Sequence, residues 1–558
     1  MSMGTHDDDY GTTDEANHQQ DVVGIAEMHH EHQHINYVDA PMKQRKKKSS
    51  EAHTYGSFVA YCFCVNYILG VGVLGVPNGF QQGGVLIGPI FLFIVTIFAA
   101  LVLNWILETL CRANAFMKEQ EKQKLEEKSS LLHHEPSSED GNETAVVTAS
   151  VDTDNRVIIE DHTATSELFE FPQRRYEMNE LSRLFLGRIG KVIYEIALCC
   201  YLYGSLWSYS TVFAESMASH VPLPINGWFT CNVYSDTSST CDALYKIYVG
   251  LYALVVVPMT CLNLTEQKPV QIILTIFRYV ALALMIGVAF ISMFVDPYSR
   301  YPSNPHTAME RHPPYVSETY LARGQGIYIL LPICIYSQIL HHSVPGLCEP
   351  VRNKKHLPAI FTSTFVTTYL FYTILGIVLA VYYGDNILGT CSLNFGYYRG
   401  GKPFGMSTPI WAELIVYVII LFPAIDVLSA FPLNAITLGN NIHAAFFTGT
   451  KWMDSRKIQV VFRLVAAVPP IIGALFVSNL EFILKYVGLF GFLITFVIPP
   501  TLFLVSKYKA RKQFGTEKTP YTRSIISSNI LAVICILFGV AAIIYCIIAN
   551  IVESVIQK

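Results

Sequence analysis

The feature that most constrains this chain is a glycine-rich interruption inside its first long apolar run. Residues 69–77 read LGVGVLGVP, and apolar sequence lies on both sides. Glycine and proline each cost a continuous helix roughly 1–3 kcal/mol, and in lipid the backbone groups that they free find no water to bind. Irregular backbone at membrane depth persists only where it is buried in protein or lines a cavity. The pattern therefore predicts a membrane helix broken within the bilayer.

The same glycines match a nucleotide-binding motif. Gly70, Gly72 and Gly75 spell G-x-G-x-x-G, the fingerprint of dinucleotide-binding folds. That fingerprint requires a preceding strand and an acidic residue about 20 positions later. Residues 61–69 are instead typical of a membrane helix, and no Asp or Glu occurs between Gly75 and Glu108. The spacing does not support a nucleotide site.

Composition places the whole chain in the membrane class. Hydrophobic residues make up 52% of the 558 residues and charged residues 15%, against about 25% charged in soluble domains. The net charge of −4 gives no indication of a nucleic-acid partner. We expect an all-α polytopic membrane protein with its transmembrane domain at residues 55–550. About 11 apolar runs are long enough to cross roughly 30 Å of hydrocarbon, at residues 56–80, 85–110, 189–217, 245–262, 270–295, 324–347, 359–383, 409–438, 458–478, 481–505 and 525–550.

The distribution of Lys and Arg predicts the orientation. A basic cluster at residues 43–48 precedes the first run, and further basic clusters lie in alternate loops. The opposite loops carry few basic residues, so we expect a cytosolic amino terminus. Cys231 and Cys241 then lie in a loop on the extracytosolic side, where disulfides persist. We expect a bridge between them, with Cys391 as the alternative partner.

Two polar segments are expected to be disordered and cytosolic. One is the tail at residues 1–50, and the other is a loop at residues 118–175 inserted between the second and third helices. In that loop Glu127, Leu131 and Leu132 resemble an acidic dileucine sorting signal. Such a signal is bound by clathrin adaptors and favours an endolysosomal or vacuolar membrane over the plasma membrane. Because the motif is short, chance is the alternative explanation.

A second interruption is predicted in the sixth run. Polar residues at 337–343 precede a Pro-Gly pair within an otherwise apolar segment. Carriers built from inverted repeats have broken helices in matching positions, and each half-helix end carries about half an elementary charge. Such ends suit the carboxylate and ammonium of a zwitterion, which predicts an amino acid as cargo. The expected cradle consists of Gly70, Gly72, Val73, Gly75, Tyr336, Ser337, Gln338 and His341.

These residues carry a resemblance to a known family. Residues 70–77, followed by Phe80 and two glycines at 83–84, are similar to the first helix of the amino acid/auxin permease family, in the amino acid–polyamine–organocation superfamily. The resemblance covers about residues 55–550 outside the insert. It implies a five-plus-five inverted repeat with broken helices 1 and 6. Stretches similar to the transmembrane protein 104 branch of this family occur at residues 107–115, 201–205, 334–337, 342–345 and 421–441.

Three polar residues at membrane depth are candidates for coupling to Na⁺ or H⁺. Asn66 lies one turn before the first break, where sodium-coupled carriers of the resembling family have an asparagine linked to the ion. Asp426 lies in the eighth run between two prolines, and intramembrane carboxyl groups usually face a cavity or a partner. Ser429 is a nearby second ligand. The alternatives are an interhelical hydrogen bond for Asn66 and a structural pair with a Lys or Arg for Asp426.

Other charged and titratable residues suggest a gate and a proton path. Glu108 and Arg278 lie at similar predicted depths, so we expect them to form an ion pair that closes an inner gate, with Glu195 early in the third run as another possible partner. His341 and His342 are candidate proton carriers, because imidazole titrates near neutral pH. Hydration at the cytosolic end of the sixth run explains both histidines equally well.

These features predict a secondary active transporter that moves a small amino acid-like solute by alternating access. We expect symport with Na⁺ or H⁺ and neither a cofactor nor a resident metal. The alternative is an amino acid sensor that binds cargo and signals through residues 1–50 without significant flux. An enzyme is not expected, because the loops contain no paired nucleophile-and-base motif. The expected partners are the amino acid, membrane lipids and clathrin adaptors, and not nucleic acid.

Overall fold

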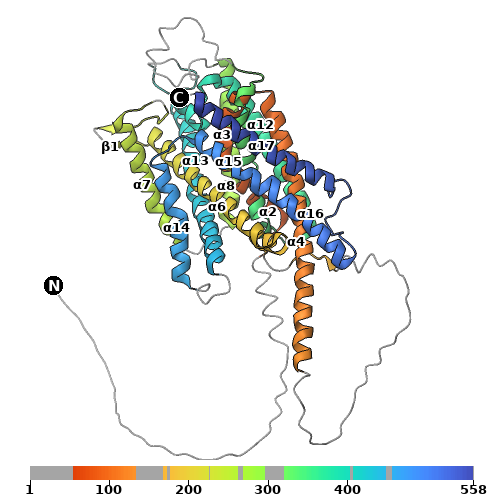
Figure 1. Ribbon diagram of the computed structural model, residues 1–558. Helices are drawn as coiled ribbons and strands as arrows, with labels where there is room; N and C mark the ends of the chain where they lie inside the picture. The colour runs from red at the N-terminus through yellow and green to blue at the C-terminus, as the bar shows by residue number, and fades with distance from the viewer. Residues whose placement is uncertain are drawn as a thin grey trace, which may run out of the picture. The chain divides into compact units, whose positions relative to one another are not determined.

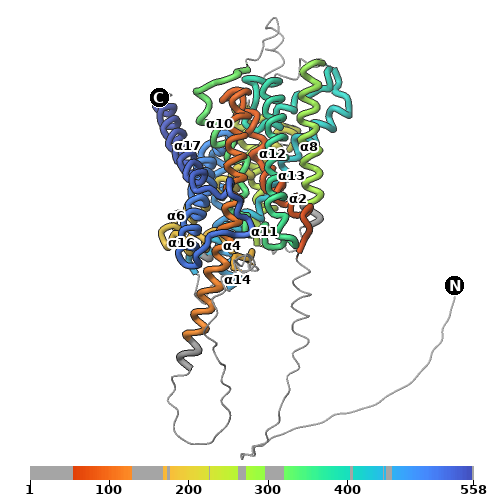
Figure 2. Tube along the Cα trace, turned by 90° about the vertical axis from the view of Figure 1, so that its right-hand side faces the viewer, coloured from red at the N-terminus to blue at the C-terminus, as the bar shows by residue number. Residues whose placement is uncertain are grey.

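The described residues fold into a bundle of helices with one two-stranded ribbon (Figures 1 and 2). The computed structural model describes residues 54–132, 168–172, 176–224, 227–234, 236–261, 268–295, 319–402, 406–447 and 455–556. The predictions for the tail at residues 1–50 lie outside the described residues. The longer elements are α2 (Ser57–Ile68), α3 (Gly72–Gly83), α4 (Ile87–Leu132), α6 (Met178–His220), α7 (Ser239–Cys261), α8 (Lys268–Val295), α10 (Ile327–Tyr336), α12 (Leu357–Tyr383), α13 (Ile410–Phe447), α14 (Arg456–Ala474), α15 (Leu480–Phe492), α16 (Ile498–Phe514) and α17 (Asn529–Ile556). The shorter ones are β1 (Leu223–Pro224), β2 (Trp228–Phe229), η1 (Gly324–Gly326), η2 (His341–Ser343), α11 (Val344–Cys348), η3 (Lys354–His356), η4 (Gly384–Asn386), η5 (Cys391–Tyr397) and η6 (Leu493–Val497).

The helices confirm an all-α polytopic membrane protein. Within the described ranges, nine helical segments are long and apolar enough to cross a membrane, and the bent pair α2–α3 makes ten. The third predicted run forms α6, which is outside that number because hydroxyl and charged side chains are frequent along it. Each predicted run therefore corresponds to a helix or a helix pair, while the inverted repeat stays a prediction.

The outer helices expose apolar side chains to the surroundings. Ile276 on α8 is 59% exposed and Leu537 on α17 is 63% exposed. Apolar surface left in water costs about 25 cal/mol per Å², whereas lipid tails solvate it without that cost. The exposed faces of α8 and α17 are those expected of a multi-pass integral membrane protein.

The first predicted break is present between α2 and α3. Residues 69–71 leave the α-helical pattern, and the axes of the two helices differ by 53°. Tight turns replace regular helical bonding here, because the amide of Gly70 donates to the carbonyl of Ile68 at 2.8 Å. The amide of Val73 in turn donates to the carbonyl of Gly70 at 3.3 Å.

The second predicted break is present between α10 and α11. Helix α10 ends at Tyr336, residues 337–340 are not α-helical, and the chain resumes through η2 into α11. Helix α3 packs against both α10 and α12, so the chain beyond the first break lies beside the chain before the second. The fold thus brings together two interruptions that are far apart in sequence.

The predicted loop at residues 118–175 begins later than expected. Helix α4 continues without a break to Leu132, about 69 Å in length at 1.5 Å per residue. Its last turns extend beyond the neighbouring helices in Figure 1. Residues 118–132 are rich in Glu, Lys, Gln and Leu, which are strong helix formers, and Lys122 and Glu126 form an i,i+4 pair at 3.8 Å. The dileucine-like residues Glu127, Leu131 and Leu132 therefore lie on a helix and not in a flexible loop, while residues 133–167 are outside the described residues.

A short ribbon and a disulfide cover the end of α6. Strands β1 and β2 pair antiparallel, with Leu223 opposite Phe229. Cys231 is bonded to Cys241 at the start of α7, as predicted, with their Cα atoms 5.7 Å apart. Cys391, the alternative partner, is a buried free cysteine.

Candidate functional site

The two breaks are in direct contact at Gly72. A Cβ atom added to Gly72 would lie 3.0 Å from the Cα atom of Ser337 and 3.0 Å from Cδ1 of Tyr336. A Cβ on Gly75 would lie 2.8 Å from Cδ1 of Leu484 on α15. A side chain at Gly72 would press on the backbone of Ser337, whereas at Gly75 it would meet the flexible end of Leu484. The structure thus brings together Gly72, Gly75, Tyr336 and Ser337 of the predicted cradle.

Gly70 and Val73 lie at the edges of this contact. The nearest heavy atom to a Cβ added on Gly70 would be the hydroxyl oxygen of Tyr209, at 3.8 Å. Tyr209 comes from α6, and its hydroxyl accepts a hydrogen bond from Asn434 of α13 at 3.4 Å. Val73 is buried in the first turn of α3. Polar groups from α6 and α13 therefore approach the first break beside Gly70.

The carbonyl groups at the end of α2 are bound by side chains from other helices. The guanidinium of Arg278 on α8 donates to the backbone carbonyl of Asn66. Tyr372 on α12 donates its hydroxyl to the carbonyl of Ile68 at 2.8 Å. A helix carboxyl end carries partial negative charge, so a cation at this position is favourable. Both donors come from elements distant in sequence, and neither of these two hydrogen bonds was predicted.

The predicted coupling residues are bridged by that same guanidinium. Nε of Arg278 donates to Oδ1 of Asp426 at 2.7 Å, and the two side chains are 2% and 5% exposed. Asn66 and Asp426 do come together, but a cation of the chain itself lies between them. A part for Asp426 in coupling to Na⁺ or H⁺ stays a prediction, and what the structure shows is the alternative, an ion pair with an arginine. The ion pair forms because a buried carboxylate needs a compensating charge.

The other two parts of the predicted ion site are also committed to protein contacts. The side-chain oxygen of Asn66 accepts a hydrogen bond from Thr275 of α8 at 3.0 Å. Ser429 donates to the backbone carbonyl of Asp426 at 2.9 Å, within its own helix. Neither side chain is thus directed at a shared ion in this arrangement.

The predicted gate between Glu108 and Arg278 is wrong. Glu108 forms a fully buried ion pair with Arg112, one turn along α4, at 2.6 Å. It also accepts hydrogen bonds from Ser527 at 2.5 Å and Thr522 at 3.0 Å. Arg112 donates to the carbonyl of Glu517 at 3.0 Å. The cluster ties α4 to the segment between α16 and α17, while Arg278 is taken by Asp426.

Two predicted cradle side chains point to other helices. Gln338 donates to Thr96 of α4 at 3.1 Å and accepts from Thr368 of α12 at 3.1 Å. The ring of His341 lies 2.9 Å from the carbonyl of Ala99, measured from Nε2. Both side chains are fully buried in these contacts. Gln338 and His341 therefore brace the second break against α4 and α12, and only their backbone stays a candidate for binding cargo.

His342 differs from its neighbour. It is buried, and neither ring nitrogen has a hydrogen-bond partner among the described residues. Its ring lies edge-on to Tyr201 at 5.5 Å and to Tyr67 at 6.1 Å. Tyr201 also packs on Tyr336 at 5.8 Å. At the second break an imidazole without a hydrogen-bond partner among the described residues lies among tyrosines. It can donate a hydrogen bond to a polar solute or accept one from it.

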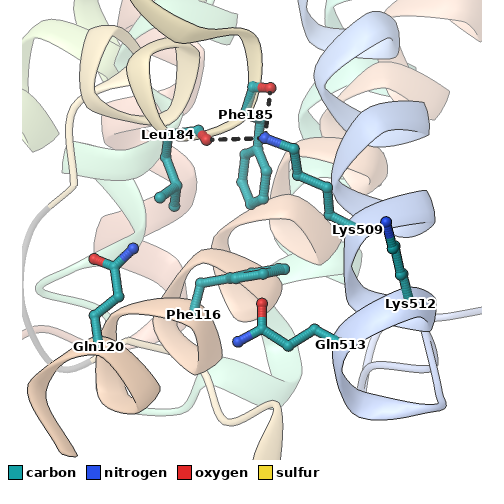
Figure 3. Close-up of a pocket in the computed structure, with 7 residues that line it drawn as sticks. All are labelled: Phe116, Gln120, Leu184, Phe185, Lys509, Lys512 and Gln513. Atoms are coloured by element: carbon teal, nitrogen blue, oxygen red, sulfur yellow. Dashed lines mark hydrogen bonds between the residues drawn. The ribbon is translucent and has the colours of Figure 1, made fainter. Parts of the chain in front are cut away.

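A surface pocket lies elsewhere, between α4, α6 and α16. It has a volume of about 460 Å³ and shares no residue with the two breaks. Figure 3 shows Nζ of Lys509 at the carbonyls of Leu184 and Phe185, at 3.3 Å and 3.1 Å. This lysine therefore serves the kinked start of α6, where Gly187 has φ of 75°. The pocket is separate from the candidate site.

Sequence reasoning missed several polar residues of the interior. Arg112 was detectable, because Glu108 and Arg112 have i,i+4 spacing on one helix face. Glu215 was detectable by the same rule that singled out Asp426, since it is an acid within an apolar run. Thr275 and Tyr372 carry no such signal, because hydroxyl side chains are common in membrane helices.

The comparisons with known proteins agree with this architecture. A family model described as transmembrane amino acid transporter protein matches residues 163–552. Transmembrane protein 104 of Homo sapiens is 26% identical over 490 residues, covering 83% of this chain and 89% of the relative. The transmembrane protein 104 homolog of Drosophila melanogaster is 24% identical over 517 residues, covering 87% and 96%. The family match spans most of the chain, and the chain belongs to the transmembrane amino acid transporter family.

Proposed function

We propose that this protein is a secondary active transporter that moves a small amino acid-like solute across a membrane by alternating access. The observation that carries the proposal is the contact of two broken helices at Gly72 and Ser337. Broken helices are costly in lipid and occur in carriers at the solute site. The two breaks touch here, so we assign the structure to a closed state.

An amino acid fits the polarity of the site. Helix α3 begins at Gly72, and its first amide groups present partial positive charge to the break. These groups suit a carboxylate, as in other carriers with discontinuous helices. His342 and the tyrosines around it offer hydrogen bonds for the rest of the solute. Transport in place of catalysis also agrees with the family.

The coupling ion in this proposal is Na⁺ or H⁺, and the structure favours H⁺. Sodium needs several oxygen ligands in one place. The oxygen atoms predicted for it, on Asn66 and Asp426, are bound to Thr275 and Arg278. A fixed guanidinium at the end of α2 supplies the positive charge that a bound Na⁺ would bring.

We further propose an endolysosomal or vacuolar location and a cytosolic amino terminus. The basic loops support the orientation. Glu127 lies exposed on α4 in the part that extends beyond the bundle, where a clathrin adaptor has access to it. The disulfide between Cys231 and Cys241 lies on the opposite, lumenal side in this arrangement.

Purified protein in liposomes tests the transport role. The probe is an equimolar mixture of ¹⁴C-labelled amino acids, offered with a pH gradient, with a Na⁺ gradient and with neither. Concentrative uptake under one gradient supports the proposal. Saturable binding of a labelled amino acid without flux under any gradient overturns it in favour of a sensor.

A further inference from the structure

A second buried carboxyl group, Glu215, lies near the end of α6. Its side chain is fully buried. One oxygen, Oε2, accepts a hydrogen bond from Thr390 at 2.6 Å, and the hydroxyl of Tyr234 is a second hydrogen-bond partner of this carboxyl. No ion pair to Lys, Arg or His involves Glu215 in the part of the chain that the structure describes. Glu215 therefore differs from Asp426 and Glu108, which each contact an arginine.

The groups around Glu215 are uncharged or acidic. Tyr234, in the segment before α7, has its hydroxyl 3.3 Å from that of Thr390. Helix α7 contributes Tyr245, which donates to the carbonyl of Ala474 at 2.9 Å. His220 follows on α6 itself and packs against Tyr417 of α13, and the first turn of α15 contains Glu481, whose backbone lies next to Gly389. An unpaired carboxylate in such surroundings costs several kcal/mol, so the neutral, protonated acid is the form that fits.

Thr390 connects this carboxyl to a loop that packs on α3, the helix that follows the first break. The loop spans residues 384–397 and includes η4 and η5, and η5 contacts α3. A Cβ on Gly75 would lie 4.0 Å from the carbonyl oxygen of Gly389. At its other end the loop is held by Gln81 of α3, which donates to Asp385 at 2.9 Å. The residue that binds Glu215 is thus directly adjacent to the residue that covers Gly75.

We propose that Glu215 is the proton-binding group of the transporter and that the loop at residues 384–397 closes over α3 only when this carboxyl is protonated. The inference rests on the proposed function and names its coupling ion. With the loop raised, the carboxylate is hydrated and takes a proton from lumenal water onto one oxygen. Closure then buries a neutral acid that still accepts a hydrogen bond from the hydroxyl of Thr390. An acidic lumen therefore favours closure of the loop at residues 384–397 and movement of the solute out of the lumen.

The test compares Glu215→Gln with Glu195→Gln in proteoliposomes. Glu195 lies on the same helix, is paired with Lys191 at 3.3 Å and is not part of the site, which makes it a matched control. Glutamine keeps the shape of Glu215 and its acceptor for Thr390 but cannot release a proton. We measure accumulation of the ¹⁴C-labelled mixture with the lumenal side one pH unit more acidic, and counterflow of the same mixture without a gradient.

We expect wild type and Glu195→Gln to accumulate solute about tenfold under that gradient, because one pH unit is worth about 1.4 kcal/mol for one coupled proton. Glu215→Gln should accumulate none and retain counterflow. Accumulation by Glu215→Gln equal to that of wild type overturns the assignment. So does wild-type accumulation that needs only a Na⁺ gradient, a result that leaves the transport role intact and does not depend on the variant. Absence of wild-type flux in every condition overturns the proposed function itself.

Discussion

The two helix breaks are built in different ways. The first, between α2 and α3, depends on glycine, and its free carbonyl groups are bound by Arg278 and Tyr372 from other helices. The second, between α10 and α11, carries its own polar side chains, and Gln338 and His341 reach out to α4 and α12. The first break is therefore stabilised from outside and the second from within. A site that must open needs only one of these sets of contacts to be released.

The largest effect is expected at the ion pair that stabilises the first break. Asp426→Asn leaves Arg278 buried without its counter-charge, which should cost about 3–5 kcal/mol. The apparent melting temperature in detergent, measured by scanning fluorimetry, should fall accordingly. Asp242→Asn is the control, because Asp242 forms an exposed pair with Lys246 worth about 0–1 kcal/mol. Equal melting temperatures for the two variants would contradict the role given to the buried pair.

At the contact between the two breaks we expect a smaller loss of folding stability than at the ion pair, together with a complete loss of transport. Gly72→Leu places a side chain where a Cβ already lies 3.0 Å from Ser337, and overpacking costs about 1–3 kcal/mol. The breaks should separate, and counterflow of ¹⁴C-labelled amino acids should cease. Gly250→Leu on α7 has open space around it and should transport normally. Normal counterflow by Gly72→Leu would show that the contact is not part of the cargo site.

The bracing of the second break is tested by Gln338→Leu. This change removes two interhelical hydrogen bonds, to Thr96 and Thr368, which average about 0.6 kcal/mol each in membranes. We expect a loss of about 1 kcal/mol and faster hydrogen exchange confined to residues 337–343, as measured by mass spectrometry. Faster exchange at residues 69–71 instead would show that Gln338 stabilises the first break and not the second.

The smallest effect is expected from Tyr372→Phe at the first break. It removes one hydroxyl from the carbonyl of Ile68, at about 0.6 kcal/mol. Tyr203→Phe is the control, since its hydroxyl donates to the carbonyl of Val465 at 2.8 Å, between α6 and α14. Both variants should lose similar stability, and only Tyr372→Phe should change the rate of counterflow. Identical transport by the two would place the carbonyl of Ile68 outside the moving part.

Much of the fold could be predicted from local sequence. Long apolar runs identified the helices, and the glycines at 70–75 and the polar residues at 337–343 marked both interruptions. The extent of α4 could also have been predicted, because residues 118–132 are rich in strong helix formers. Their polarity suggested disorder instead. The disulfide between Cys231 and Cys241 followed from two cysteines in one polar loop.

The candidate site was less accessible, because partners depend on how helices are rotated about their axes. Asp426 was identified as an acid in lipid, yet its partner lies 148 residues away on α8. Glu108 and Arg278 have similar depth in the sequence, but in the bundle each faces a different neighbour. The directions of Gln338 and His341 follow from the packing of the second break against α4 and α12.

The sequence by itself determined where this chain crosses the membrane and where its helices cannot stay continuous, since hydropathy and helix propensity belong to single residues and their neighbours. Only the tertiary structure decided which charges neutralise each other and which buried acid, Glu215, has no cationic partner among the described residues. Compensation of charge is a property of pairs, and a pair exists only once the helices that carry it are packed.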